Sequence, residues 1–263
     1  NNIIKALNFD YSGPIDGHNF KSLLRELKRL KKKKGPKFLH VITTKGKGLS
    51  QAEKDQVTYH SPGQFDAKTG EIIPKNNEGL PPKYQDVFGE TIVELARRNK
   101  KIIGITPAML SGSSLKMMLE EFPKRTFDVG IAEQNLVGIS AGLAKEGYIP
   151  FASSFAPFIT MRAAEQVRMN LGYMHLNVKL VAIGSGLSMG FLGNSHFGLE
   201  DLAIMRSIPD LVILSPSDGL EIVKCVEAAS EFSGPVFIRL TGQPNMPIVY
   251  DHDYEFTIGK SVL

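Results

Sequence analysis

From residue 84 onward, stretches whose apolar residues have helical spacing alternate with short runs whose apolar residues fall on both faces. The helical stretches span 86–98, 114–122, 135–147, 161–173, 199–208 and 219–230, and the short runs span 101–106, 126–131, 149–155, 178–184, 211–216 and 235–240. Strands that are apolar on both faces are typical of a parallel sheet covered by helices on both sides. The pattern therefore predicts an α/β fold with a parallel sheet flanked by helices.

The N-terminal part of the chain follows a different pattern. Four leucines at helical spacing predict a helix over 19–33, with Asn19 as its N-cap and a stop before Gly35. The β-rich run 37–45 is expected to form a strand that leads into a glycine-rich loop. Residues 46–83 show little periodicity and many Gly, Pro, Lys and Asp residues, which predicts a linker or a functional loop.

Composition and charge limit the class of protein. Hydrophobic residues make up 42% of the chain and charged residues 22%, as in a soluble globular protein. Much of the net charge of +4 lies in the run 28–37, which is typical of a solvated helix end and carries no interleaved aromatics, so we expect no nucleic-acid partner. The single cysteine, Cys225, excludes an internal disulfide. Without an apolar stretch of about 20 residues or a signal peptide, we expect no membrane partner and a cytoplasmic location.

An acid interrupts one apolar strand-to-helix junction. In "DVGIAEQN", residues 128–135, Glu133 stands where the apolar run should continue. Ligands of open parallel sheets bind beyond the carboxyl ends of the strands, and the other strand ends, such as "GITPAM", "SSFAPF" and "AIGSG", are also small and polar. Glu133 therefore falls where a ligand would lie. The alternative is a first-turn acid stabilised by the helix dipole, worth under about 1 kcal/mol, and the residues alone leave both interpretations open.

Several motifs in the same order resemble a known family. "FDVGIAEQNLVGISAGLAKEGYIPFASSF" resembles the pyrimidine-binding domain of the transketolase family of thiamine diphosphate enzymes. "YSGPIDGHN", "GPKFLHVITTKGKGLSQAEKD", "TYH", "FDAKTG" and "ITPAM" resemble one member of that family in particular. The resemblance implies the thiamine diphosphate-binding fold of a pyrimidine domain. It also implies four parts: the end of a diphosphate-binding domain at 1–48, a linker at 49–83, the pyrimidine-binding domain at 84–250 and the start of a further linker at 251–263.

The resemblance implies roles in binding thiamine diphosphate. Glu133 would form a hydrogen bond with N1′ of the aminopyrimidine and favour the imino tautomer, whose 4′-nitrogen takes the proton from thiazolium C2. Phe158 and Phe155 would pack on the ring, and Arg162 would brace the site. Leu49, after "GKG", and Met109, in "ITPAM", match further cofactor contacts. Without the resemblance, core phenylalanines and a surface arginine remain the alternatives.

Two histidines are the candidates for acid–base chemistry. His60 in "TYH" and His196 in "NSH" match active-site histidines of the resembling enzyme, which suit proton transfer or the binding of substrate hydroxyls. A solvated loop histidine is the alternative for each. The remaining histidines are interpreted as structural or solvated: His18, His40, His175 and His252.

Two departures from the family pattern affect the expected function. The "GDG" motif with a following asparagine, which holds the diphosphate and Mg²⁺, is absent, because neither "IDGHN" nor "SDGLE" continues as required. We therefore expect no metal ligand in this chain and a diphosphate site in preceding sequence or in another polypeptide. In addition, Ser185 and Leu192 stand where Arg and Asp are expected, and Arg239 lies one turn before the usual phosphate-binding arginine.

The resemblance implies a transferase that condenses pyruvate with glyceraldehyde 3-phosphate and releases carbon dioxide, working as a homodimer. The alternatives are a ketol transferase acting on another sugar phosphate and a non-catalytic partner subunit. The altered residues 185 and 192 leave the acceptor sugar open.

Overall fold

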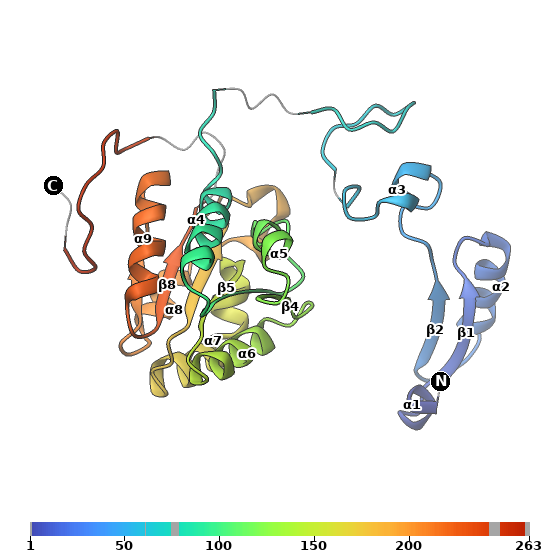
Figure 1. Ribbon diagram of the computed structural model, residues 1–263. Helices are drawn as coiled ribbons and strands as arrows, with labels where there is room; N and C mark the ends of the chain where they lie inside the picture. The colour runs from blue at the N-terminus through green and yellow to red at the C-terminus, as the bar shows by residue number, and fades with distance from the viewer. Residues whose placement is uncertain (1, 61, 75–78, 242–247, 261–263) are drawn as a thin grey trace. The chain divides into compact units, whose positions relative to one another are not determined.

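The computed structural model describes residues 2–60, 62–74, 79–241 and 248–260 (Figure 1). The chain divides into two compact units, Asn1–Asn77 and Glu78–Leu263. Each unit is described by itself below.

The first unit is built on two parallel strands. Its elements are α1 (Asn2–Ala6), β1 (Asp10–Asp16), α2 (Phe20–Lys31), β2 (Lys37–Ile42) and α3 (Ser50–Lys54). β1 pairs with β2, with a register shift between Ser12 and Ile15. The predicted helix over 19–33 is confirmed as α2, and Asn19 Oδ1 accepts a hydrogen bond from the Ser22 amide at 3.0 Å. The basic residues in the last turn of α2 lie at the negative end of the helix dipole, which they stabilise.

The second unit contains the predicted parallel sheet. Its six strands lie in the order β4-β3-β5-β6-β8-β7, and every pairing is parallel. The strands are β3 (Ile102–Thr106), β4 (Thr126–Asp128), β5 (Ile149–Phe155), β6 (Lys179–Ile183), β7 (Val212–Leu214) and β8 (Val236–Arg239). All residues of β3 and β6 are buried, which explains why both strands are largely apolar. The predicted fold class is confirmed.

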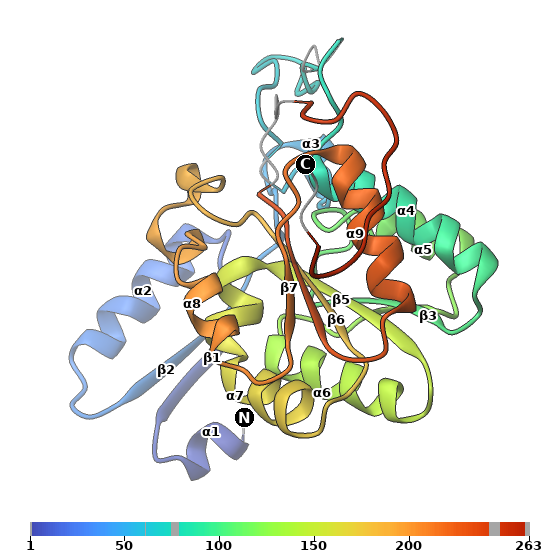
Figure 2. The ribbon, with the colours of Figure 1, turned by 90° about the vertical axis from the view of Figure 1, so that its left-hand side faces the viewer.

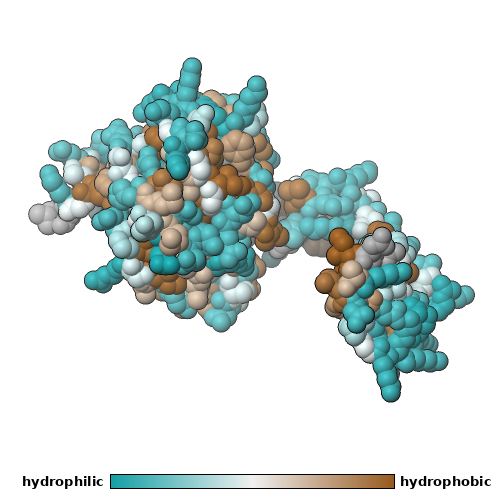
Figure 3. Space-filling model, turned by 90° about the horizontal axis from the view of Figure 1, so that it is seen from below, coloured by the Kyte–Doolittle hydropathy of each residue, from teal (hydrophilic) through white to brown (hydrophobic). Residues whose placement is uncertain are grey.

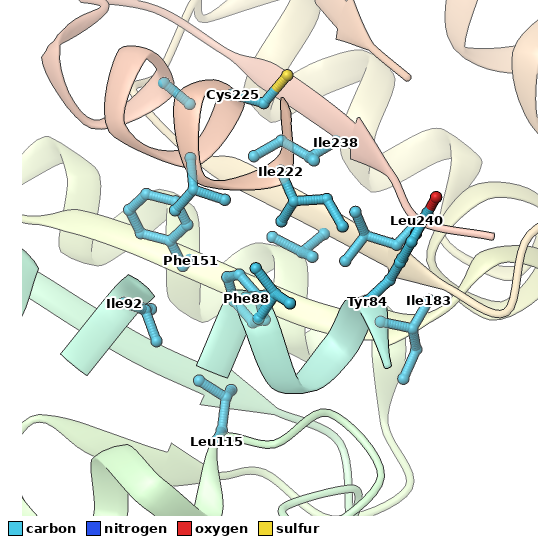
Figure 4. Packing of buried hydrophobic residues seen from close by; sticks show 14 of the residues in the cluster. Tyr84, Phe88, Ile92, Leu115, Phe151, Ile183, Ile222, Cys225, Ile238 and Leu240 are labelled. Atoms are coloured by element: carbon cyan, nitrogen blue, oxygen red, sulfur yellow. The ribbon is translucent and has the colours of Figure 1, made fainter. Parts of the chain in front are cut away.

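Helices cover both faces of this sheet (Figure 2). They are α4 (Tyr84–Arg98), α5 (Lys116–Glu121), α6 (Glu133–Lys145), α7 (Ala164–Val167), α8 (Asp201–Arg206) and α9 (Gly219–Glu231), with π-helical turns η1 (Phe158–Arg162) and η2 (Arg168–Tyr173) and 3₁₀ turns η3 (Gly190–Leu192) and η4 (Asn194–His196). One buried cluster joins α4, α5 and α9 to the sheet, with the rings of Phe88 and Phe151 6.3 Å apart (Figure 4). The other joins α6, α7, η1, η2 and α8 to the opposite face.

Several predicted bounds were wrong, including those of the strands predicted over 37–45 and 211–216, which are shorter as β2 and β7. The strand predicted over 126–131 ends at Asp128, because the chain turns there to approach α6. That helix begins at Glu133 rather than at 135. The helix predicted over 161–173 is instead the succession η1, α7 and η2.

In the view of Figure 3, hydrophilic side chains cover much of the surface, and apolar patches are visible on each unit. Among the described residues, no helix combines the length and the apolar character that a membrane span requires.

Candidate functional site

A tight turn after β4 places Glu133 at the carboxyl ends of the strands. Asp128 Oδ1 accepts hydrogen bonds from the amides of Ala108, at 2.7 Å, and Gly130, at 2.9 Å. Gly130 has a φ of +72°, a conformation that glycine adopts without strain. Asp128 thereby joins the loop after β3 to the loop after β4. Asp128 was not among the predicted site residues, although its place at a strand end before a glycine is typical of a turn.

The carboxylate of Glu133 is buried and paired with an arginine. Its side chain is 4% exposed, and Oε1 accepts a hydrogen bond from Arg162 Nη1 at 2.8 Å. Arg162 ends η1, which packs against α6. Its guanidinium lies over the ring of Phe158, 4.0 Å from the centroid, in a cation–π arrangement. Arg162 is therefore tied into the site, even though its side chain is 45% exposed.

Two phenylalanines and a histidine form an aromatic group beside this ion pair. Phe155, at the end of β5, lies edge-on to Phe158 at 5.8 Å between ring centroids. His196, in η4, lies 5.4 Å from Phe155 and 5.1 Å from Phe158. Ser195 Oγ is 3.0 Å from Nδ1 of His196. The structure thus brings five of the predicted site residues together at the carboxyl ends of the strands: Glu133, Arg162, Phe155, Phe158 and His196.

Met109 lies in the loop after β3 and contacts the neighbouring strand. Its sulfur accepts a hydrogen bond from Ser154 Oγ of β5 at 3.8 Å. In the same strand, Ser153 Oγ is buried and has no hydrogen-bond partner among the described residues. Met109 is placed at the correct end of the sheet for a ligand contact, and its role as one stays a prediction.

Arg239 at the end of β8 is neutralised by an aspartate. Its Nε donates to Asp201 Oδ2 at 2.7 Å, and the Asp201 side chain is 1% exposed. Asp201 lies 38 residues away in the sequence, so no local pattern pairs it with Arg239. Ser185 is buried in the loop after β6, and Leu192 is 41% exposed. Neither of these two side chains supplies the charge that the family pattern leads one to expect.

Leu49 and His60 lie in the first unit, and their proposed roles stay predictions. Leu49 is the half-buried residue before α3. His60 is exposed, with Nδ1 2.6 Å from Lys45 Nζ. His18 Nε2 accepts a hydrogen bond from the Thr44 amide at 2.7 Å, a structural contact. The described residues contain no group of three His, Cys, Asp or Glu side chains that could hold a metal ion.

A six-stranded parallel sheet, covered by helices and lined at its carboxyl edge by this group of side chains, defines an α/β domain of the doubly wound class. Residues 81–246 match the family described as the pyrimidine-binding domain of transketolase. The chain therefore belongs to that family. Residues 1–43 match a second family, described as 1-deoxy-D-xylulose-5-phosphate synthase.

Relatives named 1-deoxy-D-xylulose-5-phosphate synthase align with nearly the whole chain. It is 46% identical to the 1-deoxy-D-xylulose-5-phosphate synthase of Cytophaga hutchinsonii, over 98% of this chain and 41% of that protein. It is 45% identical to the synthase of Phocaeicola vulgatus, over 90% of this chain and 38% of that protein. The chain thus spans about two fifths of the length of these relatives.

Solved structures show the same fold. The structure described as "Split gene transketolase, inactive beta4 tetramer" superposes with a TM-score of 0.60 and 40% identity, over 68% of this chain and 58% of that chain. A transketolase from Campylobacter jejuni superposes with a TM-score of 0.58, over 94% of this chain and 49% of that chain. Its identity of 18% supports the fold alone.

Proposed function

We propose that this chain supplies the pyrimidine-binding part of a thiamine diphosphate-dependent transferase. The reaction is the condensation of pyruvate with glyceraldehyde 3-phosphate to 1-deoxy-D-xylulose 5-phosphate, a precursor for isoprenoids, thiamine and pyridoxal. Relatives named for this synthase, at 46% and 45% identity, support the reaction. The observation that carries the proposal is the buried carboxylate of Glu133 beside an aromatic group.

The residues present fit the aminopyrimidine half of thiamine diphosphate. Glu133 would accept a hydrogen bond from the ring nitrogen N1′, and its burial strengthens that bond because little water competes for the carboxylate. Phe158 and Phe155 offer flat apolar surfaces for the ring. The bound cofactor would supply the electron sink that decarboxylation of pyruvate requires.

We propose that His196 is the side chain of this group that transfers a proton or binds a substrate hydroxyl. Its ring lies edge-on to both phenylalanines, which places it beside the surface proposed for the aminopyrimidine. We propose the same kind of role for His60, from the first unit. Leu49 and Met109 would complete the contacts with the cofactor.

The diphosphate and Mg²⁺ need ligands from elsewhere. The described residues hold no group of acidic or histidine side chains suited to a metal ion. The relatives are more than twice as long as this chain, so a preceding segment or a separate polypeptide can carry that site. We also propose that the complete enzyme is a homodimer located in the cytoplasm.

In this proposal, the residues that bind the acceptor sugar phosphate differ from those of the family pattern. Ser185 and Leu192 cannot form charge-assisted hydrogen bonds, each worth about 1.5–3 kcal/mol, or roughly ten- to a hundredfold in affinity. Arg239 already donates a hydrogen bond from Nε to Asp201. We therefore expect pyruvate to be decarboxylated, but glyceraldehyde 3-phosphate to be a poor acceptor compared with its use by a typical synthase.

One observation favours a second function. The chain shares 40% identity with the protein described as a split gene transketolase, and that structure is described as an inactive tetramer. A ketol transferase acting on another sugar phosphate, or a subunit without activity of its own, fits that similarity.

Steady-state assays of the complete enzyme test these functions. Pyruvate with a panel of aldehydes is expected to give turnover, and Glu133→Ala is expected to abolish it while the midpoint of thermal unfolding stays within a few degrees. Turnover with ketose donors but not with pyruvate would favour transketolase. A wild-type rate of C2 proton exchange in Glu133→Ala would contradict the role of the glutamate. Efficient use of glyceraldehyde 3-phosphate would contradict the expectation for the acceptor.

A further inference from the structure

The ion pair between Glu133 and Arg162 controls which oxygen of the carboxylate is open to a ligand. A buried carboxylate is strongly disfavoured unless a charge or hydrogen-bond donors compensate it. Arg162 Nη1 provides that compensation at 2.8 Å, and it does so at Oε1. The Glu133 side chain is 4% exposed, so water contributes little.

The second oxygen, Oε2, is left without a donor from the described part of the chain. It is also not among the fully buried polar atoms without a partner in that part. Oε2 is therefore not sealed off completely, although the side chain as a whole is only 4% exposed, while Oε1 is held by the arginine. A ligand that approaches Glu133 meets one acceptor oxygen in a fixed direction.

The arginine is itself fixed by an aromatic ring. Phe158 and Arg162 are the first and last residues of η1, and the guanidinium lies 4.0 Å from the ring centroid. The turn that carries them is anchored by the buried residues Ile159 and Thr160, and Thr160 Oγ1 donates to the Ala156 carbonyl at 2.6 Å. A guanidinium is planar and presents its donors in a rigid fork, so stacking on the ring sets the direction of its N–H bonds.

We infer that Arg162 is a positioning residue for Glu133: it binds Oε1 and leaves Oε2 as the acceptor for an N–H group of the ligand. The inference rests on the proposed function, because that function supplies the N–H donor. Arg162 then acts on the ligand through Glu133 and not by touching it.

A double-mutant cycle tests whether Glu133 and Arg162 are energetically coupled in the folded chain. Arg162→Gln leaves a buried carboxylate unpaired and is expected to lower the folding equilibrium constant about tenfold or more. In the background of Glu133→Gln, the same substitution is expected to have an effect of less than about twofold, because no charge is left to compensate. Arg162→Lys keeps the charge without the stacked fork and is expected to rescue part of the loss. Equal losses in both backgrounds would show a merely structural arginine and overturn the inference.

The complete enzyme gives a second readout, the apparent dissociation constant of thiamine diphosphate. Arg162→Gln is expected to raise it about tenfold, and to raise it no further when Glu133 is already glutamine. Additive losses would mean that Arg162 contacts the cofactor or substrate directly, which refutes the positioning role but leaves the proposed function intact. If the wild-type enzyme binds no thiamine diphosphate, the proposed function is wrong and the inference fails with it, whereas the coupling measured by unfolding is unaffected.

Discussion

Lys179, the first residue of β6, is completely buried, and its replacement by methionine tests how the sheet holds an amine in its interior. Nζ donates hydrogen bonds to Asn177 Oδ1 at 2.6 Å and to the carbonyls of Phe232 at 2.8 Å and Gly234 at 2.7 Å. These acceptors are all neutral. Burial lowers the pKa of Lys179 from its ordinary 10.5 to about 7.

The lowered pKa gives the pH dependence of stability a definite sign. Between pH 7 and 10.5 the unfolded chain binds this proton more tightly than the folded chain, so the free energy of unfolding rises with pH. The linkage relation gives a rise of about 2 kcal/mol between about pH 7 and pH 9. Cys225 opposes the rise at higher pH, because burial raises the pKa of its thiol from 9.0 to about 12. The informative window therefore ends near pH 9.

Urea unfolding of the wild type and of Lys179→Met across this window measures the effect. The variant is expected to lose the rise, and to be less stable at about pH 9 because two carbonyls lose their donor, at about 1–3 kcal/mol each. Lys101→Met is the matched control, since Lys101 is exposed directly before β3, and it is expected to keep the rise. A wild-type curve without a rise, or an equal rise in Lys179→Met, would refute the reasoning.

Two further predictions concern the cofactor and the segment after the sheet. Calorimetric titration of this chain alone is expected to show no binding of thiamine diphosphate at micromolar concentration; tight, Mg²⁺-dependent binding would contradict the missing diphosphate site. The carboxylate of Asp218 caps α9 by accepting a hydrogen bond from Glu221 N, and it also accepts hydrogen bonds from the amides of Val249 and Tyr250. Asp218→Ala is therefore expected to lower the free energy of unfolding by about 2 kcal/mol and to speed proteolysis within 248–260. Unchanged proteolysis would show that other contacts hold the segment.

The strands of the sheet could be predicted because most of them are short and largely apolar. The run 101–106 corresponds to β3 and 178–184 to β6, both buried on the two faces. Glu133 could be singled out for the complementary reason, since an acid in an apolar junction has no role in packing. Burial therefore explains both the predicted sheet and the leading site residue.

Other features could not be predicted from local spacing. β1 contains Gly13 and Pro14, residues that rarely favour a strand, and its pairing with β2 depends on a partner more than twenty residues away. The shortening of β4 depends on Asp128, whose side chain binds two backbone amides of neighbouring loops. The π-helical turns η1 and η2 retain apolar residues at nearly helical spacing, so the sequence predicts an ordinary helix there.

The two arginines at the carboxyl edge show why charge at a site cannot be judged from sequence position alone. Arg162 could be a brace or a surface residue by its sequence, and the structure pairs it with Glu133, 29 residues away. Arg239 lies close to where a phosphate ligand is expected, yet its Nε is bound to Asp201. Each pair balances one positive with one negative charge, so neither offers an uncompensated arginine to a phosphate group. These pairings support the expectation, made under the proposed function, that glyceraldehyde 3-phosphate is a poor acceptor.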